Sequence, residues 1–70
     1  MTVTLEVHAF DVRGGRSSTV MNGVRPEDAA GVAAAWLAGH RGDLNLTPRN
    51  GGDGPATYRY ADITEIRIYR

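Results

Sequence analysis

The stretch PEDAAGVAAAWLA, residues 26–38, decides the fold, because it is the only segment whose sequence favours a helix over its whole length. Pro26 suits the first helical position, where a missing N–H costs nothing. Glu27 and Asp28 follow, where carboxylates meet the positive end of the helix dipole. Gly39 comes directly after the last apolar residue and suits a left-handed C-terminal cap. The sequence therefore predicts one helix in mid-chain, with extended segments on both sides.

One face of this helix is predicted to cover the core. At about 100° per residue, five apolar side chains fall on it: Ala29, Val32, Ala33, Trp36 and Leu37. Most of them are small, so a sheet can approach closely, and Trp36 is the large side chain that fills the remaining space. We expect Trp36 to pack on Val3, Leu5, Val7, Ile66 and Ile68.

The opposite face of the helix carries small residues in place of charges, which an amphipathic surface helix would show there. These residues are Gly31, Ala34, Ala35 and Ala38. Alanine is also the best helix former and is harmless when exposed, so composition alone accounts for part of this pattern. A glycine in mid-helix is unfavourable, however, and a close approach of another helix is a reason to keep it. We expect the chain to self-associate, either through this face or through exposed strand edges.

The extended segments are marked by alternation of apolar and polar residues, or by β-branched and aromatic content. Gly14 and Gly15 indicate a hairpin turn over residues 13–16, and Asn22-Gly23 is a second turn signal. The predicted strands are residues 2–12, 17–21, 44–47, 57–60 and 64–69. We expect a break at 61–63 that leaves Ile63 in the core, and an exposed, mobile, glycine-rich loop at 49–55.

This order of elements predicts one α+β domain over residues 1–70, with two layers and the order β-β-α-β-β, with or without a fifth strand. A single, mainly antiparallel sheet covered by the one helix is expected. The order of elements resembles that of β-grasp proteins. The C-terminal Gly-Gly of ubiquitin-like modifiers is absent, so the resemblance does not imply conjugation or sulfur transfer. An open meander covered by one helix fits equally well.

Composition limits the classes of function. Eight arginines balance eight acidic residues, lysine is absent, and the formal net charge is zero. Arginine suits bidentate contacts to phosphate or carboxylate, but a GC-rich genome, such as a bacterial or phage one, also explains the abundance of Arg, Ala and Gly. There is no cysteine for a disulfide or a zinc thiolate. Residues 1–6 alternate and do not form an apolar signal segment, so a cytoplasmic location is expected.

No motif in the chain predicts catalysis. His8 lies beside Glu6 on the outward side of the first strand, without a nucleophile at a recognisable spacing. His40 with Asp43 offers too few ligands for zinc, so we interpret it as a partner of the helix C-terminus. The glycine-rich residues 50–54 lack the Lys-Ser/Thr of a phosphate loop, and the Arg-Gly-Asp at 41–43 is attributed to chance. No enzyme activity, cofactor, metal or small-molecule substrate is predicted, and no membrane association.

A nucleic-acid interface is the alternative. Arginine and aromatic side chains on a sheet face can clamp phosphates and stack on bases. The candidate residues are Arg13, Arg16, Arg59, Arg67 and Tyr69. Sharing of one face by Arg59, Arg67 and Tyr69 requires that no kink separates the last two strands. Zero net charge counts against this alternative. The leading prediction is therefore a small, non-enzymatic protein-interaction or assembly module that binds protein, most simply a second copy of itself.

Overall fold

The structure is a computed structural model that describes residues 1–48 and 54–70. The predicted fold class is confirmed: the described residues form an α+β fold with one helix and five strands, in the expected order along the chain. The elements are β1 (Val3–Phe10), β2 (Arg16–Val24), α1 (Pro26–Leu37), β3 (Asp43–Leu46), β4 (Ala56–Arg59), a 3₁₀ turn (Tyr60–Asp62) and β5 (Ile63–Tyr69). The mobile loop predicted at 49–55 lies mostly outside the described residues.

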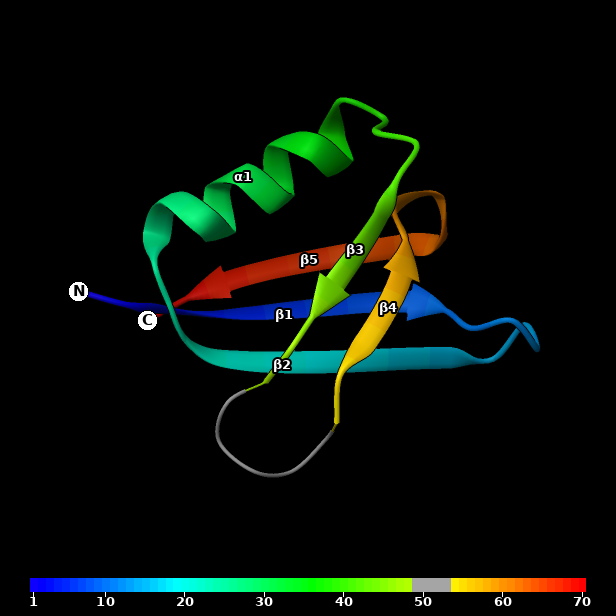
Figure 1. Cartoon of the computed structure of the whole chain (residues 1–70), viewed down its shortest axis with the longest axis horizontal. Helices are drawn as coiled ribbons and strands as arrows, with labels where there is room; N and C mark the ends of the chain where they lie inside the picture. The colour runs from blue at the N-terminus through cyan, green and yellow to red at the C-terminus, as the bar shows by residue number, and fades with distance from the viewer. Residues whose placement is uncertain (49–53) are drawn as a thin grey trace.

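The strands divide between two sheets instead of forming the single sheet that was expected (Figure 1). The larger sheet has the order β2-β1-β5, and both of its ladders are antiparallel. The smaller sheet is the antiparallel pair β3–β4, which crosses the larger sheet at a steep angle in Figure 1. The β-grasp resemblance is therefore limited to the order of elements along the chain.

The core lies on one face of the larger sheet. The alternation of β1 turns Val3, Leu5, Val7 and Ala9 to this face, and all four are buried. Leu44 and Leu46 of β3, Ala29 of α1, and Tyr60 and Ile63 complete the buried cluster. Both α1 and the β3–β4 pair therefore cover the same side of the larger sheet, and together they make the second layer.

The helix begins and ends as its sequence predicts. Pro26 opens it, and the carboxylate of Asp28 accepts a hydrogen bond from Arg25 Nε at 3.2 Å. Gly39 has φ +73° and donates its N–H to the Trp36 carbonyl, while His40 donates to the Ala35 carbonyl. These two bonds form a Schellman cap, in which glycine is favoured because its φ is positive.

The prediction of which residues of α1 face the core is confirmed for Ala29, Val32 and Trp36. It is wrong for Leu37, which is 81% exposed. The indole N–H of Trp36 donates to the Ile63 carbonyl at 3.1 Å and fixes the rotation of the helix. Leu37 is rotated about 100° from Trp36 and turns to solvent. Ala35, predicted on the outer side, instead packs against the core and is partly buried.

The turn predicted at Asn22-Gly23 is wrong, because β2 runs through these residues to Val24. Val3 pairs with Val24 and Leu5 pairs with Met21, so β2 carries one extra residue over this interval. The extra residue makes a β-bulge, in which Gly23 adopts φ +69°. The same sequence signal, a residue that tolerates positive φ, serves a bulge here and not a turn.

β1 is shorter than predicted, since it ends at Phe10. The carboxylate of Asp11 accepts hydrogen bonds from the N–H groups of Arg13 and Gly15, at 2.8 and 2.9 Å, and closes the hairpin turn. Val12 lies in this turn and is almost fully exposed.

The break predicted near Asp62 is confirmed. The 3₁₀ turn separates β4 from β5, and Ile63 is buried directly after it. Ile66 packs against the core as expected. Ile68 was also predicted to be buried, but it is 42% exposed, because β5 forms an edge of the sheet and Ile68 lies close to its end.

Candidate functional site

The larger sheet has one covered face and one face over which no described element packs. We call the second the open face. The outward residues of β1 and their partners across both ladders form it: Thr4, Glu6, His8 and Phe10, with Arg16, Ser18, Val20, Glu65, Arg67 and Tyr69. Phe10, Val20 and Tyr69 are 44%, 44% and 46% exposed. The open face therefore presents three large apolar or aromatic side chains from three adjacent strands.

Glu6 organises the polar part of the open face. One carboxylate oxygen accepts a hydrogen bond from His8 Nε2, and the other accepts one from the Tyr69 hydroxyl at 3.0 Å. The hydrogen bond from His8, followed by that from Tyr69, lowers the pKa of Glu6. The same bond to Glu6 raises the pKa of Tyr69, because it stabilises the protonated phenol. The central carboxylate is thus held ionised between two donors.

The formal charges of the open face balance. Arg67 pairs with Glu65 at 3.2 Å, and His8 lies 3.9 Å from Glu65. Arg16 is the first residue of β2 and lies opposite Phe10. Two arginines therefore accompany two glutamates over this surface.

The structure separates the arginines proposed for nucleic acid. Arg16, Arg67 and Tyr69 share the open face, and Arg13 lies beyond it in the β1–β2 turn. Arg59 does not join them, because the 3₁₀ turn places it in the smaller sheet, where it binds the Asp62 carboxylate through two nitrogens at 2.8 and 3.2 Å. The bond to Asp62 raises the pKa of Arg59 further. The sharing of one sheet face by Arg59, Arg67 and Tyr69 required that no kink separates the last two strands, and the 3₁₀ turn shows that this condition is not met.

The helix residues proposed as an interface are also divided. Gly31, Ala34 and Ala38 are exposed, and a Cβ added at Gly31 would have no atom within 4 Å apart from its chain neighbours and the helix backbone. Ala35 is partly buried against the core, which takes it out of the outer strip. What remains on the outer side is a narrow, uncharged surface along α1.

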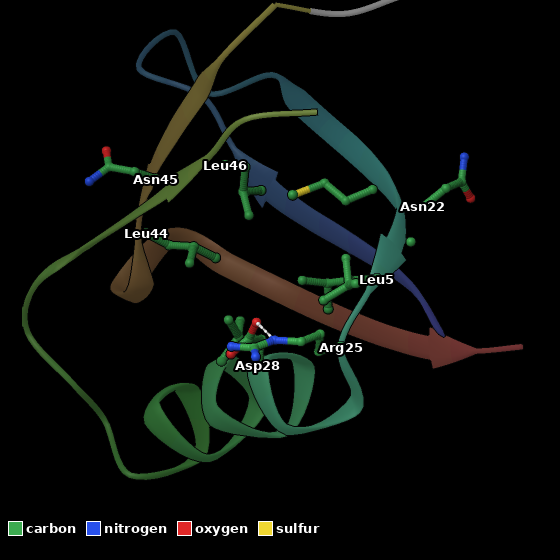
Figure 2. A pocket seen from close by; sticks show the side chains of 11 residues that line it. Leu5, Asn22, Arg25, Asp28, Leu44, Asn45 and Leu46 are labelled. Carbon is green, nitrogen blue, oxygen red and sulfur yellow. Dashed lines mark hydrogen bonds and ion pairs between the residues drawn. The ribbon is translucent and has the colours of Figure 1, made fainter. Parts of the chain in front are cut away.

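A cleft of about 390 Å³ lies between the start of α1, the end of β2, and β3 (Figure 2). We call it the β2–β3 cleft. Its apolar lining comes from four elements: Leu5, Met21, Val24, Val32, Leu44 and Leu46. The ion pair of Arg25 with Asp28 lies at the helix end of the cleft, and Asn22, Gly23 and Asn45 also line it. The sequence predicted none of this site, since its residues come together only through the bulge of β2 and the crossing of the two sheets.

A second hollow, of about 450 Å³, lies between the C-terminal end of α1 and the 3₁₀ turn. Trp36, His40, Arg41, Arg59 and Tyr60 are among its lining residues. The His40 ring meets the Tyr60 ring edge-on, with centroids 5.2 Å apart. Because the Trp36 N–H and the Arg59 guanidinium are both bound by groups of this chain, we assign no ligand to this hollow.

No protein-family model, curated protein or solved structure matches this chain. Within residues 1–48 and 54–70, no three His, Asp or Glu side chains lie close enough together to hold a metal ion. No helix of the described part of the chain is long and apolar enough to cross a membrane.

Proposed function

We propose that this protein is a small, non-enzymatic interaction module that self-associates, with two copies packing through their open faces. The observation that carries the proposal is the exposure of Phe10, Val20 and Tyr69, each near 45%, on the uncovered side of the larger sheet. The three side chains share one face of the sheet, and aromatic residues are enriched at interfaces. A cytoplasmic location belongs to the same proposal.

A second copy is the partner that the charge of the open face favours. Two arginines and two glutamates make the surface self-complementary, so a twofold arrangement can bring Arg67 of one copy near a glutamate of the other. Two sheets stack face to face at about 10 Å, with their strands about 30° apart. Sheet-on-sheet packing would bury the three apolar side chains without a change in the fold.

The size of the open face predicts a weak dimer. Three strands of about eight residues cover roughly 14 by 26 Å, or about 370 Å² in projection. A standard interface buries about 800 Å² on each partner. We therefore expect a dissociation constant in the micromolar range or weaker.

Nucleic-acid binding is the alternative, and the open face favours it less. The ionised Glu6 lies on the central strand, and Glu65 accompanies Arg67, so a phosphate backbone would meet carboxylates as well as arginines. Binding of random oligonucleotides that weakens steeply with salt would favour this alternative over self-association.

Sedimentation equilibrium from about 10 µM to about 1 mM tests the proposal. The expected mass rises with concentration from 7.5 kDa toward twice that value. Val20→Arg should keep the protein monomeric, because Val20 points outward from the middle of β2. Leu37→Arg is the matched control, since Leu37 is an exposed apolar residue away from the open face, and it should associate like the parent.

A third variant distinguishes the two surfaces. Ala34→Arg places a charge on the exposed side of α1 without disturbing the core. If Ala34→Arg abolishes association and Val20→Arg does not, the helix is the contact and the open face is not. A mass of 7.5 kDa at every concentration would contradict self-association altogether.

A further inference from the structure

Within residues 1–48 and 54–70, β3 pairs with β4 alone, so one of its two edges is free. The N–H of Tyr60 donates to the carbonyl of Gly42 at 3.2 Å, which places the backbone groups of residue 42 on the side of β4. Backbone groups alternate from side to side along an antiparallel strand. All four residues of β3 lie opposite residues of β4, but only the backbone groups of Leu44 and Leu46 point toward β4 and form the ladder hydrogen bonds. The N–H and C=O of Asp43 and Asn45 point to the free edge. Outside the β3–β4 ladder, no backbone hydrogen bond among the described residues reaches Asp43 or Asn45.

The free edge of β3 opens into the β2–β3 cleft. Asn45 lines the cleft, yet its side-chain oxygen accepts a hydrogen bond from the Thr57 hydroxyl at 2.8 Å on the outer side of the smaller sheet. Figure 2 shows the Asn45 side chain pointing away from the cleft. Asn45 therefore lines the cleft with its main chain, and it offers one donor and one acceptor there.

The opposite wall of the cleft, formed by the end of β2 at residues 22–24, also presents main-chain groups. Asn22 lines the cleft, but its side chain accepts a hydrogen bond from the Thr4 hydroxyl at 3.0 Å and is directed to the open face. Gly23 has only main chain to offer. β2 is an edge strand, so the backbone groups that point away from β1 have no strand partner. Both walls thus present main-chain groups, above a floor made by apolar side chains.

We propose that the β2–β3 cleft binds an extended peptide segment of a partner protein, which adds to the free edge of β3 as a further strand. Main-chain donors and acceptors beside an apolar floor match a peptide strand, which brings main-chain groups to pair and every second side chain to bury. A guest residue opposite Leu44 would direct its side chain toward Leu5 and Val32, which line the cleft.

The length of β3 and the volume of the cleft set the length and the composition of the bound peptide. β3 has four residues, and its two outward residues suit a segment of about four to six residues. The cleft volume is near the lower end of the range for ligand sites, about 300–1,000 Å³, which suits one or two branched aliphatic side chains. Arg25 and Asp28 neutralise each other at 3.2 Å, so the site selects apolar alternation and not charge.

A designed peptide provides the probe: a capped chain of about seven residues that alternates valine and threonine, with a lysine at each end for solubility. We expect ¹H–¹⁵N correlation spectra of the ¹⁵N-labelled protein, titrated to about 2 mM peptide, to show shifts concentrated at Asp43, Asn45, Gly23 and Val32. Amide exchange at Asn45 should slow about tenfold or more on binding. A peptide that is N-methylated at its β3-facing amides should bind at least about tenfold more weakly.

Asn45→Pro is the decisive variant. Proline removes an N–H that points away from β4, so the ladder with β4 keeps its hydrogen bonds and the guest loses one. We expect the affinity to fall about tenfold or more, while Asn45→Ala, which keeps the N–H, binds the peptide like the parent. Val32→Phe is the second variant, because it fills the cleft from α1 and should block the peptide even if Asn45→Pro fails to fold.

Four outcomes would contradict peptide binding in the β2–β3 cleft. Equal binding by Asn45→Pro and Asn45→Ala would overturn strand addition, as would equal binding of the N-methylated peptide. Shifts confined to the open face, or no shift at 2 mM peptide, would overturn the site itself. The cleft and the open face lie on opposite sides of the larger sheet, so Val20→Arg should leave peptide binding unchanged, and failure of one proposal does not decide the other.

Discussion

Trp36 donates its indole N–H to the backbone carbonyl of Ile63 at 3.1 Å. This bond joins the last turn of α1 to the first residue of β5, which also forms a ladder with the central strand of the larger sheet. The aromatic ring packs against the same buried cluster. One side chain therefore fixes both the rotation of the helix and its position along the sheet.

The first prediction concerns this side chain. Trp36→Ala removes the packing and the hydrogen bond together and should cost about 3–5 kcal/mol, a large share of the stability of so small a domain. Trp36→Phe keeps most of the packing and should cost about 1–3 kcal/mol, mainly for the unpaired Ile63 carbonyl. Urea denaturation followed by far-UV circular dichroism measures both. A Trp36→Phe variant as stable as the parent would show that the hydrogen bond does not matter.

The second prediction concerns the contact between the two sheets. The hydroxyls of Thr19 and Tyr58 lie 2.7 Å apart, and Thr19 is buried. Tyr58→Phe leaves a buried hydroxyl without this partner and should cost about 1–3 kcal/mol. Adding Thr19→Val should recover part of that loss, since both polar groups are then gone. A double-mutant cycle in urea should give a coupling of about 0.5–1.5 kcal/mol, and purely additive costs would contradict the bond.

The third prediction compares two glycines that both have open space around an added Cβ. Gly23 has φ +69° in the bulge of β2, so Gly23→Ala should cost about 1–2 kcal/mol through backbone strain alone. Gly31 lies exposed in α1, so Gly31→Ala should stabilise the monomer by about 0.5–1 kcal/mol. Thermal denaturation at low concentration measures both. Destabilisation by Gly31→Ala that appears only at high concentration would place a partner helix against α1.

The fourth prediction concerns acid. The pKa of Glu6 is lower in the folded protein than its ordinary value of 4.5, because His8 and Tyr69 donate to the carboxylate. A lowered folded pKa contributes stability that is present above pH 4.5 and is lost as the pH falls through the folded value. Glu6→Gln should therefore lose less melting temperature than the parent between about pH 6 and about pH 3. Glu27→Gln, at an exposed carboxylate on α1, controls for net charge and should follow the parent.

The fifth prediction concerns stability at alkaline pH and the same bond between Tyr69 and Glu6. The pKa of Tyr69 is raised above its ordinary 10.0 by the bond to Glu6. A raised folded pKa contributes stability below pH 10.0 that is lost as the pH rises through the folded value. Tyr69→Phe should melt with a weaker dependence on pH in this range. An unchanged alkaline profile would show that the hydroxyl is not bound to Glu6 in solution.

Much of the local structure could be predicted from short stretches of sequence. Pro26 and Gly39 mark the two ends of α1, because each residue has a backbone preference that needs no distant partner. The alternation of β1 predicts which of its side chains are buried. Asp62 predicts the break before β5 through its poor fit to a strand.

The errors occur where long-range contacts decide. Asn22-Gly23 allows a turn or a bulge, and only the pairing of Val3 with Val24 selects the bulge. Leu37 and Ala35 exchange their predicted environments, because the bond from Trp36 to Ile63 rotates the helix by an amount that apolar content alone does not specify. Arg59 and Arg67 have the same strand parity, yet the 3₁₀ turn places them in different sheets.

The sequence by itself determined the element types, their order and the face of β1 that is buried, since turns, caps and alternation act over a few residues. Only the tertiary structure decided that the strands form two sheets, that the outward face of the larger one stays open with Phe10, Val20 and Tyr69 exposed, and that β3 and the bulged end of β2 enclose a cleft. Those features depend on which side of the sheet the second layer covers. That choice follows from burying Leu44, Leu46 and Ala29 against β1, a packing energy shared among residues far apart in the chain.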